Sequence, residues 1–464
     1  MIRSYIRNII GKSAEKTNIP KHWLDFIEEP YSTITVKFPL ERKNGIETII
    51  GHRVIHSNHI LPTKGGLRFT KTSDLDTLGG LAAIMSFKSA ILGIPYGGAK
   101  GCVMINPKEY SEIEKTLITR RFTVEMWKRS MISSATDIMG PDHGTNSRTM
   151  NVIRDTYKSL NNTNNVDIDN VVVGKSIQFG GLEAYNMSHG LGVAAAVNYI
   201  TENTTHSNLV TEYTGYDLSA HKKSVIIHGF GKTGYHTAVK LLESNKYKII
   251  GITERGGGVY NPIGLKIEEV KKYLENSEDY SLKGFDSSHL TADETLTRKC
   301  DIVVITTKEF SVDKDIASKI DCKFIFEGAN IPLTKEAQDV LIDKGTIVVP
   351  DLLSSCGSQI CGYIEWLKNL EHRNLTMLYK RFESRVRSQF IKLIVEEGSS
   401  IKKMTKYEGP TEHDLVTSCI EEMVFNSFEN VIQEANKNTV DLRTAAYKIG
   451  LEKIYSYYDD KRIL

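Results

Sequence analysis

Apolar and polar residues alternate along an early part of the chain. Residues 32–40 and 46–54 each follow this two-residue period, and the polar segment 41–45, which ends in glycine, separates them. Because the side chains of a strand point alternately to its two faces, this pattern predicts a β-hairpin. From 74 to 92 the apolar spacing becomes that of a helix, and the glycine-dense segment 93–101 that follows is predicted to be a loop.

Short apolar runs alternate with helical patterns in the second half of the chain. The runs lie at 224–228, 247–252, 301–306, 323–326 and 346–349. Such alternation predicts a parallel sheet with helices on both faces. Earlier helices are expected at 111–128, 147–160 and 188–202, and helical patterning dominates 359–459, with a long amphipathic run near 375–397.

Size, charge and cysteine content narrow the class of protein. A chain of 464 residues exceeds one usual hydrophobic core, so two domains are expected. Lysine plus arginine (59) nearly equals aspartate plus glutamate (57), and the basic residues are scattered, so nucleic acid is not an expected partner. The six cysteines form no CxxC pair, which favours reduced thiols inside a cell, and no histidine-rich spacing indicates a metal site.

The chain has no run of about 18 apolar residues, so no membrane span is predicted. A cytoplasmic location is expected. The arginines and isoleucines of the first seven residues resemble a mitochondrial presequence, which leaves that compartment as the alternative.

The segment 228–234, His-Gly-Phe-Gly-Lys-Thr-Gly, follows a predicted strand and precedes a predicted helix. In this context a Gly-x-Gly-x-x-Gly motif binds a dinucleotide. Gly229 permits the tight turn, Gly231 lets the backbone approach the pyrophosphate, and Gly234 allows close helix packing. The alternative is a glycine-rich turn that has no ligand.

Glu254 stands at the end of the next predicted strand, near the position where an acid accepts hydrogen bonds from the ribose hydroxyls. This residue favours NAD as the cofactor. Its neighbour Arg255 could instead bind a 2′-phosphate, so NADP or dual use stays open.

Lys64, Lys88 and Lys100 lie beside glycines or small residues. Crowded amines can have a lowered pKa, which proton transfer near neutral pH requires, although solvated surface lysines are the alternative. Asp142 follows a proline and is expected on a loop, where its carboxylate can exchange a proton with a bound amine. Asp137 could simply cap or turn the chain.

These motifs resemble the glutamate, leucine, phenylalanine and valine dehydrogenase superfamily, and most closely the hexameric glutamate dehydrogenases of the animal type. The resemblance runs from about residue 31 to the C-terminus. Its markers are the segments 56–59, 63–66, 97–100, 141–142, 327–330, 365–370 and 441–447.

The resemblance implies an α/β fold with three parts. These are a substrate-binding and oligomerisation domain at 1–187, a Rossmann-type NAD(P)-binding domain at 188–360, and a helical pivot with a shortened antenna-like segment at 361–423. The C-terminal helices at 424–464 are expected to pack back on the first domain.

The resemblance also implies reversible NAD(P)-dependent oxidative deamination of L-glutamate to 2-oxoglutarate and ammonia by a homohexamer. Lys64 is implied to pair with the side-chain carboxylate of the substrate, Lys88 to hold its α-carboxylate, Lys100 to act as the catalytic lysine and Asp142 to transfer the proton. The implied cofactor contacts are Gly229, Gly231, Gly234, Glu254 and Asn330.

Several positions depart from the family pattern. Tyr185 stands where the family has an arginine for the substrate carboxylate, Gly362 where it has a serine, and Ser355 where it has an asparagine. His189 takes the place of a nicotinamide-binding threonine, and Thr306 lies in a segment that replaces Pro-Ala-Ala. The departures keep two alternatives open: a dehydrogenase for a different L-amino acid, and a catalytically weak regulatory paralogue in a mixed hexamer.

Overall fold

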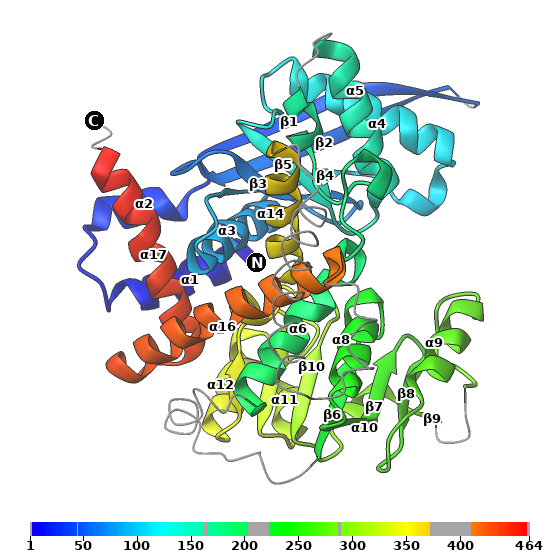
Figure 1. Ribbon diagram of the computed structural model, residues 1–464, viewed down its shortest axis with the longest axis vertical. Helices are drawn as coiled ribbons and strands as arrows, with labels where there is room; N and C mark the ends of the chain where they lie inside the picture. Colours follow the sequence, from blue (N-terminus) through cyan, green and yellow to red (C-terminus); the bar gives the residue numbers. More distant parts are fainter. Residues whose placement is uncertain are drawn as a thin grey trace, which may run out of the picture.

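The computed structural model of the protein describes residues 2–43, 45–161, 166–202, 222–285, 289–371 and 410–461. These residues form two β-sheets, which lie in the upper and lower halves of Figure 1. The strand orders are β1-β2-β4-β3-β5 and β12-β11-β10-β6-β7-β8-β9. The predicted α/β fold class with a helical C-terminal region is confirmed.

The first sheet contains five strands: β1 (Ser32–Arg42), β2 (Gly45–Ser57), β3 (Thr63–Phe69), β4 (Gly97–Val103) and β5 (Asp137–Pro141). The first two pair antiparallel with Ser32 opposite Ile55, which confirms the predicted hairpin. Strand β3 runs parallel to both β4 and β5. The carboxyl ends of these three strands therefore lie at the same edge of the sheet.

The prediction of a loop throughout 93–101 is wrong, because strand β4 begins at Gly97. A Cβ atom on Gly65 of β3 would lie 1.5 Å from the carbonyl oxygen of Ala99, and one on Gly98 would lie 2.2 Å from the hydroxyl of Ser86 in the adjoining helix. The glycines let two neighbouring elements approach closely, and they do not turn the chain. Strand β3, which contains Gly65 and Gly66, and the short strand β5 lacked a clear alternating pattern and were not predicted.

The second sheet contains seven strands: β6 (Lys223–His228), β7 (Tyr247–Glu254), β8 (Gly257–Tyr260), β9 (His289–Leu290), β10 (Ile302–Ile305), β11 (Phe324–Glu327) and β12 (Ile347–Val349). Strands β12, β11, β10, β6 and β7 are parallel, as predicted. Two further strands, β8 and β9, were not predicted and run antiparallel at the other edge. A tight turn that includes Gly256 (φ +80°) joins β7 to β8, and so short a connection allows only an antiparallel pair.

Helices cover both faces of the second sheet, which confirms the prediction. Ile227 of β6 joins one buried apolar cluster and its neighbour Ile226 joins another on the opposite face. The short helices of this half are α9 (Ile267–Asn276), α10 (Ala292–Leu296), α11 (Lys314–Lys319), α12 (Lys335–Asp343) and α13 (Asp351–Ser354).

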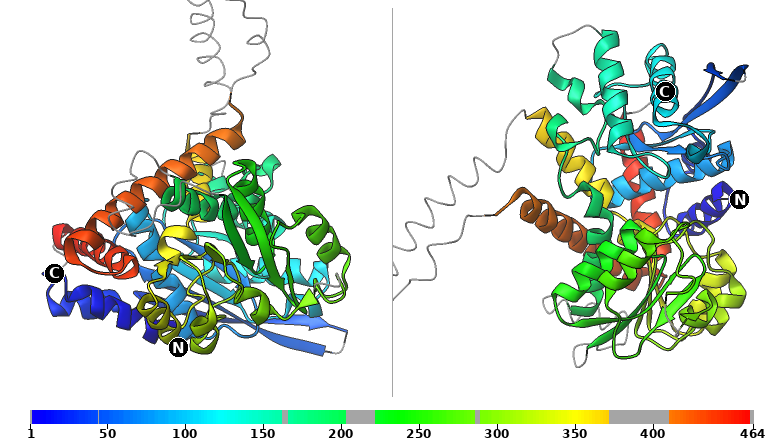
Figure 2. Two further views of the ribbon diagram at one scale, coloured as in Figure 1. Left: turned by 90° about the horizontal axis from the view of Figure 1, so that it is seen from below. Right: turned by 90° about the vertical axis from the view of Figure 1, so that its right-hand side faces the viewer.

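Long helices connect the two halves, as the views of Figures 1 and 2 show. They are α6 (Tyr185–Glu202), α14 (Gly357–Leu370) and α16 (Glu412–Asn438), with α8 (Lys232–Glu243) packed on α6. The C-terminal helix α17 (Leu442–Lys461) packs on α1 (Ile2–Ala14) and on α3 (Leu75–Leu92). Helices α2 (Lys21–Glu28), α4 (Glu112–Trp127) and α5 (Ser147–Asn161) complete the first half.

The predicted domain boundaries after 187 and 360 fall inside α6 and α14, and they stay a prediction. The amphipathic run near 375–397, and most of the expected antenna-like segment, lie outside the described residues. Helix α3 is the one described helix with the length and mean hydropathy of a membrane span, but 78% of it is buried inside the protein, which is typical of a core helix.

Candidate active site

Asp142 lies directly after β5, at the edge where β3, β4 and β5 end. Its Oδ2 atom accepts a hydrogen bond from Nε of Arg68 on β3 at 2.9 Å, and it also pairs with the amine of Lys100 on β4. Its Oδ1 atom accepts from the backbone N–H of His143 at 2.7 Å. Both oxygens of the predicted proton-transferring acid therefore have partners.

The two charges beside Asp142 determine its protonation. Burial opposes ionisation of this carboxyl, but Arg68 and Lys100 outweigh that effect and hold the pKa of Asp142 well below its ordinary value. Burial lowers the pKa of Lys100, and Asp142 opposes the decrease. Asp142 is therefore ionised, and its carboxylate is a weak base while Arg68 and Lys100 both contact it.

Lys64 of β3 points toward helix α14. Its amine donates to Oε1 of Gln359 at 2.7 Å, and a Cβ atom on Gly362 would lie 3.1 Å from the same nitrogen. Burial and the nearby charge of Lys100 lower the pKa of Lys64 to about 7. The amine is therefore only partly charged near neutral pH and has a neutral amide as its partner, which leaves it available to an anionic group.

Lys88 of α3 reaches from the first half of the molecule to the second. Its amine donates to Oδ1 of Asn330 at 2.9 Å and to the carbonyl oxygen of Ser355 at 3.2 Å, and it also bonds the hydroxyl of Ser355. Lys64 and Lys88 thus both contact segments that follow strands of the second sheet. The three predicted lysines are buried and close enough to influence one another, so they are not solvated surface lysines.

The glycine-rich turn joins β6 to α8, as predicted. Gly229 has φ +95°, a left-handed conformation that favours glycine, and a Cβ atom on Gly234 would lie 2.1 Å from the carbonyl oxygen of Gly229. Gly231 caps the N-terminus of α8, and a Cβ atom there would meet nothing within 4 Å. The first and third glycines serve the turn itself, whereas the open space at Gly231 suits a ligand that comes close to the backbone.

Glu254 and Thr306 hold this turn in place. The Glu254 carboxylate accepts from the backbone N–H of Phe230 at 2.8 Å, and the Thr306 hydroxyl donates to the carbonyl oxygen of Gly229 at 2.5 Å. The predicted acid therefore lies against the turn, at the start of a helix whose amides favour an anion. These residues fit a dinucleotide.

Two segments of the chain match one family. Residues 30–159 match the dimerisation domain of Glu/Leu/Phe/Val dehydrogenases, and residues 180–409 match the glutamate/leucine/phenylalanine/valine dehydrogenase domain. The chain is 33% identical over 461 residues to a mitochondrial glutamate dehydrogenase of Dictyostelium discoideum, an alignment that covers 98% of this chain and 90% of the relative. The chain belongs to the Glu/Leu/Phe/Val dehydrogenase family.

Other relatives agree with this assignment. An NADP-specific glutamate dehydrogenase of Halobacterium salinarum is 29% identical, with 94% of this chain and 92% of the relative covered. The leucine-bound structure of a hetero-hexameric glutamate dehydrogenase from Thermus thermophilus shares the fold, with a TM-score of 0.82, 24% identity, and 100% and 97% of the two chains covered. The predicted family, the amino-acid dehydrogenase class and the use of a nicotinamide dinucleotide are confirmed, while the choice between NAD and NADP stays a prediction.

His189 and Tyr185, two departures from the family pattern, lie on helix α6 of this dehydrogenase. Nε2 of His189 is 3.1 Å from the carbonyl oxygen of Gly328, which can only accept, so this nitrogen carries the proton; Nδ1 lies 3.2 Å from the hydroxyl of Ser358. Burial and Lys88 lower the pKa of His189 to about 4, so the ring is neutral. Burial raises the pKa of Tyr185, whose hydroxyl lies 3.3 Å from the Cβ position of Gly140.

Three residues of the site were not predicted: Arg68, Gln359 and Glu309. Arg68 stands four residues after Lys64 in the same strand, so the two-residue period alone could have placed both side chains on the same face of the sheet. Gln359 and Glu309 reach the site from segments of the second half. No local signal indicates those two contacts, because they depend on how the two halves pack.

Asp137, the other acid considered, is structural. Its carboxylate forms a two-point pair with Arg53 beneath the sheet.

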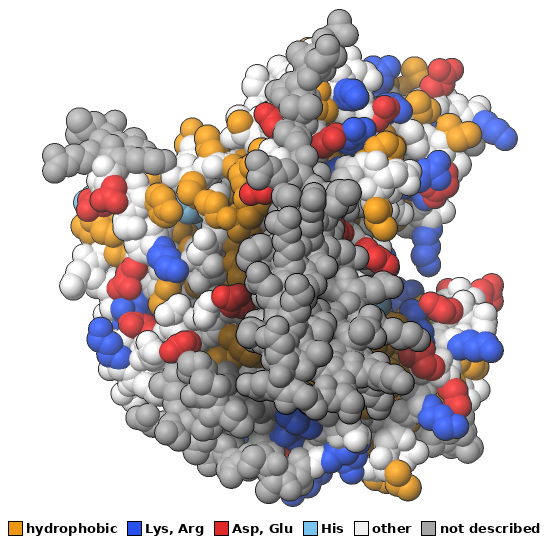
Figure 3. All heavy atoms as spheres, in the orientation of Figure 1, with side chains coloured by type: hydrophobic (Ala, Val, Ile, Leu, Met, Phe, Trp, Pro, Cys, Tyr) orange, Lys and Arg blue, Asp and Glu red, His pale blue; other side chains and the backbone are white. Residues whose placement is uncertain are grey.

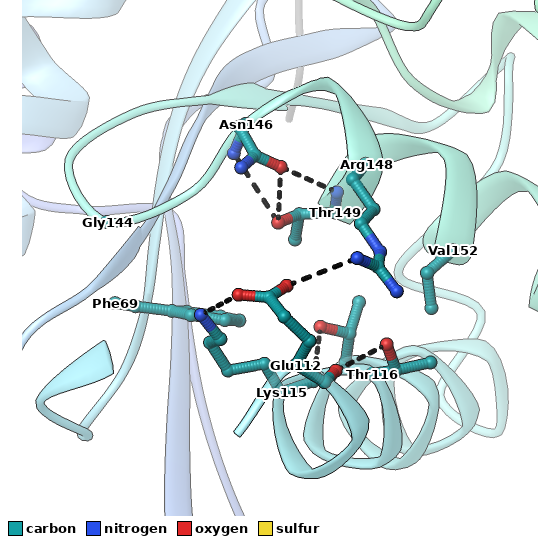
Figure 4. Close-up of a pocket in the computed structure, with 10 residues that line it drawn as sticks. Phe69, Glu112, Lys115, Thr116, Gly144, Asn146, Arg148, Thr149 and Val152 are labelled. Atoms are coloured by element: carbon teal, nitrogen blue, oxygen red, sulfur yellow. Dashed lines mark hydrogen bonds and ion pairs between the residues drawn. The ribbon is translucent and has the colours of Figure 1, made fainter. Parts of the chain in front are cut away.

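A small surface pocket beside Phe69 and Gly144 is a separate feature. The ion pair between Glu112 and Lys115 lies along this pocket (Figure 4). The described part of the chain contains no cluster of three or more metal-ligating side chains. Figure 3 shows the surface hollowed between the two halves at its right-hand edge, with charged side chains on both sides.

Proposed function

We propose that this dehydrogenase catalyses the reversible NAD(P)-dependent oxidative deamination of L-glutamate to 2-oxoglutarate and ammonia. The observation that carries the proposal is the Lys100–Asp142 pair, set beside two further buried lysines whose hydrogen-bond partners among the described residues are neutral. A dicarboxylate substrate supplies the two anions that Lys64 and Lys88 lack. The names of the relatives, which are glutamate dehydrogenases, support the same substrate.

The lysines bind and orient the substrate. Lys64 pairs with the side-chain carboxylate and Lys88 with the α-carboxylate, which places the α-carbon near Asp142. When the substrate binds, the Lys88 amine either breaks its hydrogen bond to Asn330 or bonds Asn330 and the substrate at the same time. We assign the cofactor-binding role to Asn330 and to the residues at the glycine-rich turn, Gly229, Gly231, Gly234 and Glu254.

Asp142 and Lys100 move the protons. Asp142 takes a proton from the substrate ammonium, and the free amine then forms an imine as the α-carbon is oxidised. Lys100, in its neutral form, takes a proton from the water that attacks the imine and returns it to the leaving ammonia. Because Asp142 accepts from both Arg68 and Lys100, its basicity increases only when one of these contacts lengthens.

A nicotinamide dinucleotide, when bound, accepts the hydride from the α-carbon. The open backbone at Gly231 leaves room for its pyrophosphate, and Glu254 suits the ribose hydroxyls of NAD better than a 2′-phosphate. His189, neutral and bonded to Gly328, and Thr306 orient the loops that face the nicotinamide. We therefore propose NAD as the preferred cofactor, with NADP or dual use as the alternative.

A different L-amino acid is the second candidate substrate, and Gly362 and Tyr185 favour it. Gly362 offers no hydroxyl to a side-chain carboxylate, and Tyr185 offers a neutral hydroxyl where an arginine would supply a charge.

We propose that the protein is a homohexamer and that it is located in the cytoplasm. The Thermus relative is described as a hetero-hexamer and the Dictyostelium relative as mitochondrial, so a mixed hexamer and a mitochondrial location are the alternatives.

An assay of the reductive direction tests the proposal. The purified protein is mixed with 2-oxoglutarate, ammonium and either NADH or NADPH, and the absorbance of the reduced cofactor is followed. Oxidation of the cofactor supports the glutamate function and identifies the coenzyme. Turnover only with a branched or aromatic 2-oxo acid supports the second candidate, and no turnover with any 2-oxo acid indicates a regulatory subunit.

A further inference from the structure

Arg68 joins carboxylates from the two halves of the molecule. Its Nε atom donates to Asp142 at 2.9 Å, and its Nη2 atom donates to Oε1 of Glu309 at 2.8 Å. Asp142 follows the first sheet, and Glu309 lies in the loop after β10 of the second sheet. Arg68 and Glu309 are mostly buried, so water weakens this pair less than a surface ion pair.

The loop that carries Glu309 is tied to the dinucleotide-binding turn. At its start, Thr306 donates to Gly229, and a Cβ atom on Gly229 would lie 2.8 Å from the methyl group of Thr307. At its end, the backbone N–H of Phe310 donates to the carbonyl oxygen of Ile331 at 2.9 Å. A continuous series of contacts therefore runs from the glycine-rich turn through this loop and Arg68 to Asp142.

Charged and titratable groups face Asp142 from several elements. Arg68 comes from β3 and Lys100 and Cys102 from β4, Tyr185 and His189 come from α6, and Glu309 acts through Arg68 from the second half. Glu309 is the group that offsets the positive charge of Arg68 from the far side, and it also opposes the decrease that burial causes in the pKa of Lys100. Its removal would leave the arginine charge acting on the proton-transfer pair without this compensation.

We propose that Arg68 and Glu309 are positioning residues that couple the placement of the dinucleotide-binding half to the proton-transferring Asp142. The proposal rests on the function assigned to Asp142 above. Arg68 holds the carboxylate on one side and is itself held by Glu309, so a shift of the loop after β10 changes the contact that suppresses the basicity of Asp142. Neither residue is assigned a direct contact with substrate.

The test is Glu309→Gln, which keeps the side-chain shape and removes the charge. We expect kcat to decrease roughly 10-fold, as coupled contacts of this kind allow, with the Kd of the reduced dinucleotide changed by less than about 2-fold. The pH profile of kcat should move to lower pH, because Asp142 and Lys100 both lose protons more readily beside an uncompensated Arg68. Glu309→Asp, which retains the charge, should recover part of kcat and of the profile.

Glu269→Gln is the matched control. Glu269 lies on the same half of the molecule and pairs with Lys266 at 3.0 Å, but it is exposed and far from the described contacts of Asp142. The proposal would be overturned if Glu309→Gln left kcat and its pH profile unchanged. It would also be overturned if Glu269→Gln changed both by the same amount.

A readout that needs no turnover separates this proposal from the function itself. Hydrogen exchange by mass spectrometry should show faster exchange over 306–312 in Glu309→Gln and not in Glu269→Gln. If the wild-type protein turns over no 2-oxo acid, the proposed function fails, and the exchange result still decides whether the contact fixes the loop. Equal exchange in wild type and Glu309→Gln would overturn the positioning role.

Discussion

Strand β5 has an arginine–aspartate pair at each end, and the two pairs differ. At its start, Asp137 forms two bonds of 2.7 Å with Arg53, and the side chains are 1% and 0% exposed. Just beyond its end, Asp142 pairs with Arg68 at 2.9 Å, and the side chains are 21% and 12% exposed. The residue types are the same, but the surroundings are not.

The difference lies in how completely each group is satisfied. Arg53 places its remaining N–H groups on backbone carbonyls of Gly65 and Ile138, so the first pair forms a closed unit. Asp142 shares one oxygen between Arg68 and Lys100, and Arg68 is shared with Glu309. A closed pair stabilises the sheet, whereas a pair with competing partners can change partners during a reaction.

Two other pairs of residues show the same contrast. Lys175 forms a fully buried ion pair with Glu365, whereas in the described part of the chain the hydrogen-bond partner of Lys64 is the neutral amide of Gln359. Gly234 is required by a close backbone contact, while the Cβ position of Gly231 is open. In each case the residue with the weaker or more open protein contact, Lys64 or Gly231, is the one assigned to a ligand.

The largest effect is expected for Asp142→Asn. The amide cannot accept the substrate proton, so kcat should decrease by about 10² to 10⁴. The melting temperature should change little, because the carboxylate is partly exposed and its partners can rearrange. Steady-state kinetics and thermal melting measure both. A variant that keeps wild-type kcat would show that Asp142 is not the proton acceptor.

The reverse result is expected for Asp137→Asn. This change leaves the Arg53 charge buried with a neutral partner, which should lower the free energy of unfolding by about 3 to 5 kcal/mol. The protein that remains folded at low temperature should retain most of its kcat. Chemical denaturation followed by circular dichroism gives the stability. Equal stability of the variant and the wild type would remove the contrast between the two pairs.

A pH series tests whether Lys64, which lacks among the described residues a carboxylate partner of the kind that Lys175 has, binds the anionic substrate. Burial lowers the pKa of Lys64 to about 7, so the amine is charged below that pH and neutral above it. The KM for 2-oxoglutarate should therefore increase roughly 10-fold from about pH 7 to about pH 8.5, as the charged fraction falls. Lys64→Arg remains charged over this range and should show a much flatter KM. The same increase in both proteins would assign the dependence to another group.

The smallest effects are expected for alanine substitutions at Gly231 and Gly234, and the two substitutions should differ in what they change. Gly231→Ala should fold normally, because the new methyl group meets no protein atom, and it should raise the KM for the dinucleotide by about 10-fold. Gly234→Ala would place its methyl group 2.1 Å from the carbonyl oxygen of Gly229 and should lower the melting temperature. Dinucleotide titration and thermal melting distinguish the two. An unchanged KM in Gly231→Ala would indicate that the cofactor does not approach this turn.

Much of the site could be predicted because its signals are local. The glycine-rich turn, Glu254 at the end of the following strand, and Lys64, Lys88, Lys100 and Asp142 were all found from neighbours in the sequence. The hairpin and the parallel strands followed from apolar spacing. The strands rich in glycine were missed, because glycine predicts a turn unless a neighbouring element requires close approach.

The sequence by itself determined which chemistry-bearing side chains exist and which strand or turn carries each of them, because backbone geometry and side-chain periodicity act over a few residues. Only the tertiary structure decided their partners. Asp137 is matched to Arg53, Lys64 to Gln359, and Arg68 to both Asp142 and Glu309, across separations of 74 to 295 residues. Such contacts depend on the packing of two sheets and the helices between them, and packing is a property of the whole chain.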